Sequence, residues 1–540
     1  MSFLFLKLIE KINDKDRSTK MILYKHSIVI MMMAISLISC SKSEVNTSQT
    51  EQKAVPLQAE ISVKKPNILW LFVEDISPDL GSYGETLVHT PNLDALAQSG
   101  TKFTNTIMPA PVCSALRSAI MTGVMQTTLG VHNHHSARTK ESEFYLPEHI
   151  KTVPELFKKA GYFTFNSGKD DYNFSYNRKD LYDGDYMEHP LYGKSGVAID
   201  WNARKDKSQP FFGQIQLKGG KHIFNSKFKD KVKYPIDRSE ITLPPYYPND
   251  PVVVEQWGRY LESLQITDRE VGEIIQRLED DGELENTLVF FFADHGTRFL
   301  RHKQFLYEGG IKVPFIAYWE GNPKVVTPGN RNELISGLDI SATSLAVAGI
   351  DIPDYFEGKN LFSGSYKAKD YVISARDRCD FTIDRIRSVR SARFKYIRNF
   401  FPERSGMQPS YRDEWEMTNV TRKLYTDGKL NDIQAKHFLP TREPEELYDL
   451  ENDPHEIINL VNDPAYAATL IEHRDVLTNW IKETDDKGQY PEREESLKLM
   501  LGIWGDTAIN PEFDLLREKY PDLSGSQYYL KNERFKKIKN

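Results

Sequence analysis

Two apolar segments, each followed by a polar pair, constrain the fold of this chain more than any other feature. Residues 68–73 and 287–293 are almost entirely apolar, which is typical of strands buried on both faces of a parallel sheet. The carboxyl ends of such strands meet at one edge of the sheet, where α/β proteins bind ligands. Two polar pairs there can form one cation site, since hard cations prefer carboxylate oxygens, although a solvated strand end is the alternative for each pair. The four polar residues are Glu74, Asp75, Asp294 and His295.

Helices and strands alternate through the same part of the chain. Residues 90–100 predict a helix that stops at Gly100, residues 102–107 a strand, and residues 252–281 a long helix with apolar residues at helical spacing. This alternation predicts an α/β fold with a large, doubly wound mixed sheet flanked by helices. From residue 371 onward, short strands and a hairpin predict a smaller C-terminal antiparallel sheet.

The N-terminal segment has the features of an export signal. A basic start after Met21 precedes a short apolar run, which ends in Leu-Ile-Ser-Cys40. This resembles a bacterial lipoprotein signal, so we expect lipidation of Cys40, with Met21 as an alternative start. A plain signal peptide or a membrane anchor is the alternative. We therefore expect an exported protein that is lipid-anchored to a bacterial membrane. The predicted parts are a signal peptide at 1–40, a flexible tether at 41–65, a catalytic domain at 66–365, a C-terminal subdomain at 366–490 and an extension at 491–540.

The segment Pro111–Gly123 contains one of only three cysteines. If a helix opens after Cys113, the free N–H groups of its first turn surround the thiol, and Arg117 follows one turn later. Such a position suits an anion such as sulfate or phosphate. The alternative is a buried structural thiol. Because Cys40 is predicted to carry lipid and Cys379 lies far along the chain, no disulfide framework is expected, which favours a reactive Cys113.

Several basic side chains follow predicted strands at the same edge. Lys169 comes after the strand at 163–166, and His222 comes after the strand at 210–217. Lys303 is a further candidate anion ligand, with a surface lysine as its alternative. A histidine cluster lies just after the Cys113 helix, and the sequence does not distinguish a functional cluster from an incidental one. Its members are His132, His134 and His135.

The charge balance excludes one class of function. The chain has 70 Lys and Arg residues against 77 Asp and Glu residues, a formal net charge of -7. A nucleic-acid-binding protein should carry a basic surplus, so nucleic acid is not an expected partner. An anionic substrate stays compatible with this charge, because a local basic pocket is enough to bind it.

Taken in order, these residues resemble the type I, formylglycine-dependent sulfatases of the alkaline phosphatase superfamily, and in particular bacterial polysaccharide sulfatases. The resemblance covers roughly residues 66 to 460. Each motif is weak alone, whereas the ordered set is specific. The matching elements are Glu74-Asp75, Cys113-Ser114-Ala115-Leu116-Arg117 with Met121-Thr122-Gly123, Gly168-Lys169, Asp294-His295-Gly296, Lys303 with Tyr307-Glu308-Gly309-Gly310, and Leu338-Asp339-Ile340-Ser341-Ala342-Thr343.

The resemblance implies a chemistry for each position. Cys113 would be oxidised by a maturing enzyme to formylglycine, whose hydrate attacks sulfur, and Arg117 would steady that group. Lys169 and Lys303 would neutralise the sulfate oxygens, and His222 would be the general acid for the leaving sugar oxygen. One calcium ion per chain is implied as cofactor. Its implied ligands are Glu74, Asp75, Asp294, His295 and the modified Cys113.

The sequence departs from the family pattern at four positions. Ala115 replaces a common proline, which fits the radical-type bacterial maturases that act before export. Glu74 replaces the usual aspartate. His295 replaces a common asparagine, and imidazole is a poor calcium ligand. Asp171 stands where many members have a histidine, so either the histidine cluster supplies the missing group or Asp171 itself touches the substrate.

The sequence therefore predicts a sulfuric ester hydrolase that removes sulfate from a sulfated carbohydrate. Two alternatives stay open. One is a phosphodiesterase or phosphonate hydrolase of the same superfamily, although the His and Asp supply for a two-metal site is thin. The other is a catalytically silent, surface glycan-binding protein.

Overall fold

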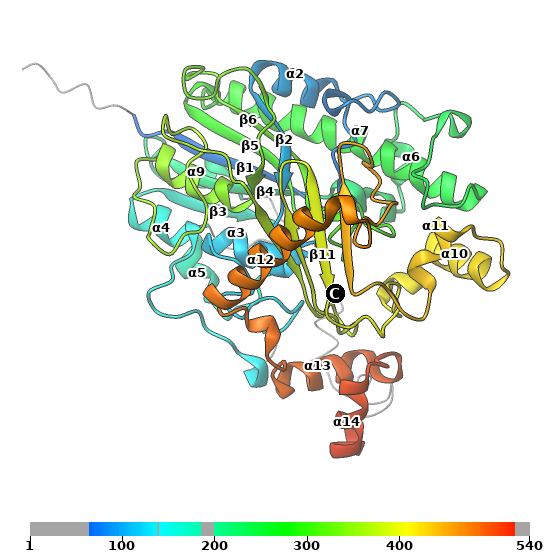
Figure 1. The fold of residues 1–540 in the computed structure, drawn as a ribbon. Helices are drawn as coiled ribbons and strands as arrows, with labels where there is room; N and C mark the ends of the chain where they lie inside the picture. Colours follow the sequence, from blue (N-terminus) through cyan, green and yellow to red (C-terminus); the bar gives the residue numbers. More distant parts are fainter. Residues whose placement is uncertain (1–63, 138–139, 185–198, 524–540) are drawn as a thin grey trace, which may run out of the picture. The chain divides into compact units, whose positions relative to one another are not determined.

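A large mixed sheet is the framework of this computed structural model, which describes residues 64–137, 140–184 and 199–523 (Figure 1). The sheet has eight strands in the order β3-β4-β1-β5-β6-β2-β7, and β8 pairs with β2. The α/β fold class predicted above is thereby confirmed. The strands are β1 (Asn67–Val73), β2 (Thr101–Ile107), β3 (Phe163–Ser167), β4 (Phe211–Leu217), β5 (Thr287–Ala293), β6 (Lys312–Tyr318), β7 (Gly329–Arg331) and β8 (Ile335–Ser336).

The two apolar segments of the sequence are the adjacent central strands β1 and β5. Every residue of both strands is buried. β1 runs parallel to β5 on one side and to β4 on the other, and Val73 lies opposite both Ala293 and Leu217. The three strands therefore end side by side, and the residue that follows each of them lies at the same edge of the sheet. This register brings Glu74, Lys218 and Asp294 to one edge.

Helices cover the large sheet in two groups (Figure 1). α3, α4 and α9 pack together, and the β1 side chains Trp70 and Phe72 face this group: the Trp70 indole donates to Ser344 of α9, and the Arg117 guanidinium of α3 stacks on Phe72. α2 packs on the long helix α7. The helices are α2 (Pro91–Ser99), α3 (Cys113–Thr122), α4 (Val153–Lys159), α5 (Arg178–Leu181), α6 (Phe228–Lys231), α7 (Pro251–Asp280), α8 (Glu308–Ile311), α9 (Leu338–Val347), α10 (Glu416–Thr426), α11 (Asp432–Ala435), α12 (Ala467–Glu483), α13 (Glu494–Trp504) and α14 (Pro511–Lys519).

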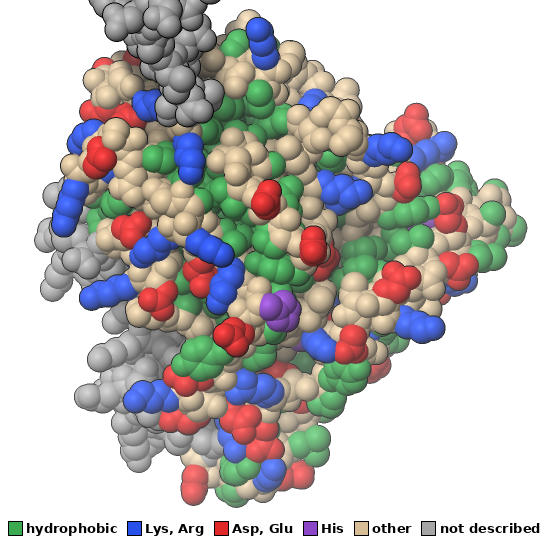
Figure 2. Space-filling view, turned by 90° about the vertical axis from the view of Figure 1, so that its left-hand side faces the viewer, with side chains coloured by type: hydrophobic (Ala, Val, Ile, Leu, Met, Phe, Trp, Pro, Cys, Tyr) green, Lys and Arg blue, Asp and Glu red, His purple; other side chains and the backbone are tan. Residues whose placement is uncertain are grey.

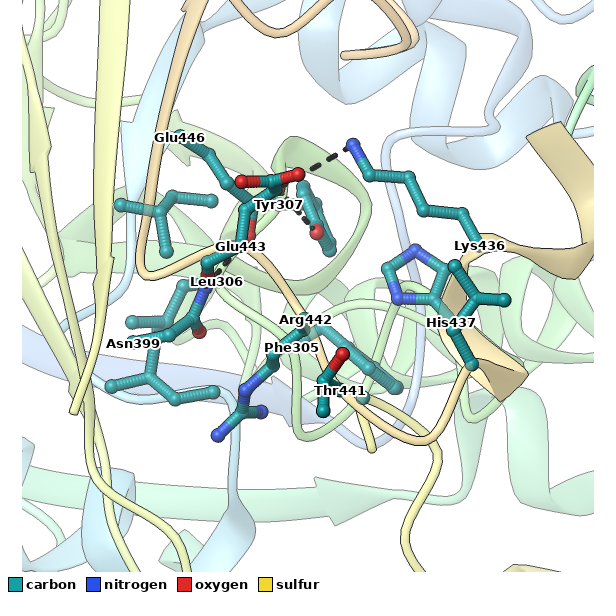
Figure 3. A pocket seen from close by; sticks show the side chains of 14 residues that line it. Phe305, Leu306, Tyr307, Asn399, Lys436, His437, Thr441, Arg442, Glu443 and Glu446 are labelled. Atoms are coloured by element: carbon teal, nitrogen blue, oxygen red, sulfur yellow. Dashed lines mark hydrogen bonds and ion pairs between the residues drawn. The ribbon is translucent and has the colours of Figure 1, made fainter. Parts of the chain in front are cut away.

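A four-stranded antiparallel sheet in the order β12-β11-β10-β9 forms the predicted smaller unit. α12 packs across β10 and β11, as Figure 1 shows. A pocket of about 330 Å³ lies between this sheet and the segment after Lys303 (Figure 3). Inside it the Tyr307 hydroxyl donates to the carboxylate of Glu446 in β12, and Lys436 forms an ion pair with the same carboxylate. The small sheet thus anchors the loop that carries Lys303. Its strands are β9 (Val372–Arg376), β10 (Ile386–Arg390), β11 (Phe394–Asn399) and β12 (Glu445–Asp449).

The ends of the chain carry several predictions that the structure does not test. The signal peptide, Cys40 and nearly all of the tether lie outside the described residues, as do residues 524–540. Within the described residues, no helix combines the length and the apolar character needed to span a bilayer. α13 and α14 of the extension pack on each other and around Phe381. The boundaries after residues 365 and 490 stay predictions.

Candidate active site

The edge at the carboxyl ends of β1, β3, β4 and β5 gathers most of the predicted site residues. Asp75 and Asp294 follow β1 and β5, Lys169 follows β3, and Cys113 is the first residue of α3. The helix predicted to open after the cysteine is confirmed, with the thiol at its N-terminus. The positive end of the α3 dipole therefore faces this edge.

Cys113 lies in contact with two basic side chains. Its Sγ is 3.1 Å from Nε2 of His295 and 3.2 Å from Nζ of Lys303, and only 3% of the residue is exposed. Burial alone would raise the pKa of this thiol, but the positive charges of Lys169 and Lys303 outweigh burial and lower the pKa to about 6. The site therefore stabilises a negative charge at the position of the Cys113 side chain.

Glu74 is the centre of a cluster of three basic side chains. Lys169 donates to its Oε1 at 2.6 Å, Lys221 donates to its Oε2 at 2.9 Å, and Arg117 lies 3.4 Å away. Burial opposes ionisation of Glu74, but these three charges hold its pKa well below the ordinary range. Arg117 is further fixed by a 2.6 Å hydrogen bond to Gln216 of β4. One carboxylate thus positions three basic side chains at the edge of the sheet.

Four side chains form a group that fits a metal ion. One ligand atom each from Asp75, Cys113, Asp294 and His295 lies within 4.8 Å of the others. Backbone N–H groups of Asp75 and His295 donate to Oδ1 of Asp294. Its buried Oδ2 receives no hydrogen bond and has only longer contacts, 3.5 Å to Nε2 of His295 and 3.8 Å to Nη2 of Arg117. A buried carboxylate oxygen without a donor is costly unless a cation satisfies it. Asp75 adopts a left-handed backbone, φ 56°, which aims its carboxylate at Lys303.

Glu74 is not a member of this group, although the sequence placed it among the metal ligands. Its two carboxylate oxygens contact lysines, as described above. Its role as a metal ligand stays a prediction.

The histidine cluster divides in the structure. His135 Nε2 is 3.4 Å from Asp171, which in turn pairs with Lys169 at 3.0 Å. His134 stacks on His135, and Nδ1 of each ring is 3.1 Å from Asp380. His132 instead lines a separate cavity of about 380 Å³ beside Tyr490. His135 therefore forms an ion pair with Asp171, and His134 also lies within 4.8 Å of that carboxylate, whereas His132 lines a separate cavity.

His222, the predicted general acid, is enclosed by the protein and contacts a carboxylate of α7. The side chain is fully buried, and Nε2 lies 3.0 Å from Glu270 of α7. Its neighbour Lys221, which sequence reasoning did not select, reaches Glu74 instead. Both belong to the 3-10 helix Gly219–Phe224 after β4, so the Lys-Gly-Gly-Lys segment at the strand end was the available signal. The acid role of His222 stays a prediction.

Charged side chains are arranged differently on the surface and in the buried site. On the face that Figure 2 shows, basic and acidic side chains are interspersed and form no basic stripe. The concentrated positive charge lies in the buried site instead, on Lys169, Lys221 and Lys303.

Comparisons with known proteins agree with this geometry. A family model described as Sulfatase matches residues 66–350. An ulvan-active sulfatase of Formosa agariphila is 30% identical over 526 residues, which cover 89% of this chain and 85% of that protein.

Solved structures share the fold at lower identity. A 2-O GAG sulfatase superposes with a TM-score of 0.58 and 20% identity, covering 79% of this chain and 94% of that one. A phosphonate monoester hydrolase of Agrobacterium radiobacter gives a TM-score of 0.56 at 17% identity, covering 78% and 96%. At this level of identity the likeness shows the fold alone, which serves both chemistries.

Proposed function

Since this chain belongs to the sulfatase family, whose members hydrolyse sulfuric ester bonds, we propose that its substrate is a sulfated carbohydrate, either a polysaccharide or its oligosaccharides. The ulvan-active relative, which aligns over most of both chains, supports a polysaccharide substrate. The observation that carries the proposal is the position of Cys113 at the start of α3, between Lys303 and His295 and beside two buried aspartates.

Cys113 is the proposed site of the nucleophile. A maturing enzyme would oxidise it to formylglycine, whose hydrate supplies the hydroxyl that attacks sulfur. Since Cys113 is almost fully buried, that enzyme must reach the cysteine before the domain folds. This order agrees with modification before export. Lys303, at 3.2 Å, is placed to stabilise negative charge on the nucleophile.

Asp75, Asp294, His295 and position 113 would hold one divalent cation. The two carboxylates suit calcium, and oxidation would replace the soft thiol at position 113 with oxygen ligands, whereas His295 is the least suitable of the set for calcium. When bound, the cation would neutralise a sulfate oxygen and favour ionisation of the nucleophile. Oδ2 of Asp294, which receives no hydrogen bond and has only longer contacts with His295 and Arg117, supports a cation at this place.

The remaining residues have roles in binding and proton transfer. Lys169 and Lys221 would contact the sulfate oxygens from the side of Glu74, and Arg117 would steady the group at position 113. His135 would take the place of the histidine that the family has at Asp171, because it is 30% exposed on its side chain and contacts Asp171. His222, held by Glu270, stays the proposed general acid for the leaving oxygen.

The cellular setting is part of the same proposal. We expect export and lipid attachment at Cys40, followed by a tether that holds the catalytic domain at a bacterial membrane. An exported enzyme at the cell surface or in the periplasm would meet polymeric glycans or their fragments there.

Sulfate release tests the proposal. The protein would be co-produced with a bacterial formylglycine-generating enzyme and incubated with ulvan, carrageenan, porphyran, chondroitin and heparan oligosaccharides, with Cys113→Ala as control. Release that disappears in Cys113→Ala supports the proposal and identifies the glycan. A parallel arm with a phosphodiester and a phosphonate monoester tests the alternative chemistry.

Two results would contradict the proposal. Turnover of the phosphoesters alone, with Cys113 oxidised by mass, would favour the phosphonate hydrolase. Tight glycan binding without any turnover, with Cys113 unmodified in the native protein, would favour a binding protein.

A further inference from the structure

Arg298 has an unusual environment four residues after Asp294. Only 5% of the residue is exposed, and its guanidinium lies between aromatic rings, 4.0 Å from the Phe224 centroid and 4.7 Å from that of Trp415. Stacking of this kind orients a guanidinium and leaves its N–H edge for planar anions.

The hydrogen-bonding groups of Arg298 are poorly satisfied. Within the described part of the chain, Nε and Nη1 are buried without a hydrogen-bond partner, and Nη2 has a single long contact of 3.5 Å to Gln256. No described carboxylate forms an ion pair with Arg298. The arginines on β9, on β10 and in the segment between these strands differ, since each pairs with a carboxylate. Those arginines are Arg376, Arg378, Arg385, Arg387 and Arg390.

A buried, unpaired guanidinium is expensive for the folded protein. Burial lowers the pKa of Arg298 to about 10, with the nearby Asp75 carboxylate as the main opposing influence. The side chain thus keeps its charge at neutral pH without a counterion within hydrogen-bonding distance. An anion supplied by a ligand would satisfy both the charge and the free nitrogens.

Arg298 is connected to the proposed sulfate site through two short segments. Phe224 ends the same 3-10 helix that carries Lys221, whose amine contacts Glu74. On the other side, Tyr411 packs edge-on against Trp415, and its neighbour Arg412 donates to the backbone oxygen of Lys303 at 2.7 Å. The aromatic rings around Arg298 therefore adjoin the residues that surround Cys113.

Phe224 is the most exposed residue of this arrangement. The ring is 58% exposed, although it covers one face of a buried guanidinium. Rotation of the Phe224 side chain would uncover Arg298 at little cost in buried apolar area. The rings of Phe224 and Trp415 would then offer apolar faces to a sugar.

We propose that Arg298, with Phe224 and Trp415, forms a subsite that binds a second anionic group of the substrate, beside the sulfate that is hydrolysed. This inference rests on the proposed function for the identity of the ligand as a sulfated sugar. The second group is either a carboxylate or another sulfate, since a guanidinium binds both in the same bidentate way.

Measurements of binding, made in a protein that cannot turn over its substrate, test the subsite. Binding is measured by calorimetry in the inactive Cys113→Ala protein, with and without Arg298→Gln. The probes are uronate-bearing ulvan oligosaccharides, the same oligosaccharides after carboxyl reduction, and singly and doubly sulfated carrageenan oligosaccharides. Arg393→Gln, which removes a half-exposed arginine from the turn between β10 and β11, is the control for loss of one positive charge.

We expect Arg298→Gln to weaken binding by about 10- to 100-fold for one doubly anionic probe and by less than about 3-fold for its singly anionic partner. Loss confined to the uronate pair identifies a carboxylate, and loss confined to the carrageenan pair identifies a second sulfate. Arg298→Lys should recover only part of the affinity, because lysine cannot donate in bidentate geometry. Equal weakening for all probes, or none, would overturn the inference.

Melting temperature separates this subsite from a purely structural arginine. Because Arg298 is unpaired, Arg298→Gln should be at least as stable as the parent protein, whereas a structural arginine would lose stability on substitution. Failure of the proposed function has a different signature: the wild type would release no sulfate from any probe, while the Arg298-dependent difference in binding would persist.

Discussion

Cys113 and Cys379 are both buried, yet their surroundings are opposite. Cys113 contacts Lys303 and His295, and its pKa is lowered to about 6. Cys379 accepts a hydrogen bond from Gln304 and lies beside Asp380, and burial together with that carboxylate raises its pKa well above the ordinary value. Burial has the same sign at both cysteines, so the nearest charges decide which thiol can carry a negative charge.

Two consecutive residues, Lys303 and Gln304, contact the two cysteines. Lys303 extends to Cys113, and Gln304 extends to Cys379. Gln304 has a left-handed backbone, φ 72°, which turns its side chain away from that of Lys303. One loop therefore supports a thiol whose negative charge is stabilised on one side, and a thiol that stays protonated beside the Asp380 carboxylate on the other. Four predictions test this division, in order of expected effect.

Removal of the Lys303 charge should have the largest effect. Lys303→Met is expected to reduce kcat/KM for sulfate release by about 100- to 1,000-fold, because one donor to developing negative charge is lost. Lys303→Arg should retain more activity. Near-ultraviolet circular dichroism would check that Asp75, left without its lysine, does not disturb the fold. A loss of less than about 3-fold in a folded variant would contradict a role in catalysis.

Alkylation of protein made without the maturing enzyme should distinguish the two thiols. Because the folded-state pKa of Cys113 is depressed, its thiolate accumulates as the pH rises through about 6, whereas Cys379 stays protonated. Iodoacetamide at pH 7, followed by peptide mass spectrometry, should modify Cys113 at least ~100-fold faster. The same reagent on urea-unfolded protein is the control. A midpoint for Cys113 above pH 8, or similar rates for both, would refute the comparison.

His135 connects the two environments, since it contacts Asp171 on one side and Asp380 on the other. His135→Gln should lower kcat for sulfate release by about 10-fold or more, as expected for a group that exchanges protons or hydrogen bonds with the substrate. His132→Gln is the matched control, because His132 lines a separate cavity. Equal losses in the two variants would remove His135 from the site.

Substitution of Cys379 should have the smallest effect. Cys379→Ser exchanges a buried sulfur for a hydroxyl and should cost about 1 kcal/mol in the free energy of unfolding, measured in urea, through imperfect packing around Gln304. Sulfate release should change by less than about 2-fold. A loss comparable to that of Lys303→Met would show that the Cys379 side of the loop takes part in the reaction.

The framework of the site could be predicted from local patterns. The apolar strands, the polar pairs that follow them and the helix that opens at Cys113 were all visible in the sequence, and the structure confirms each element. These features depend on short-range periodicity and on the rule that the carboxyl ends of parallel strands meet at one edge of the sheet.

The sequence did not show which side chains contact one another within the site. The Lys-Gly-Gly-Lys segment after β4 was the available signal for Lys221, but a short basic segment alone does not show that its second lysine reaches Glu74.

The sequence by itself determined the α/β fold class, the family and the residues that meet at the sheet edge, because each follows from local composition and order. Only the tertiary structure decided that Glu74 pairs with lysines, that His135 rather than His132 reaches Asp171, and that Arg298 lies unpaired between rings. Those contacts join segments far apart in the chain. Their geometry depends on strand register, loop conformation and the burial of charge, which arise only when the whole domain packs.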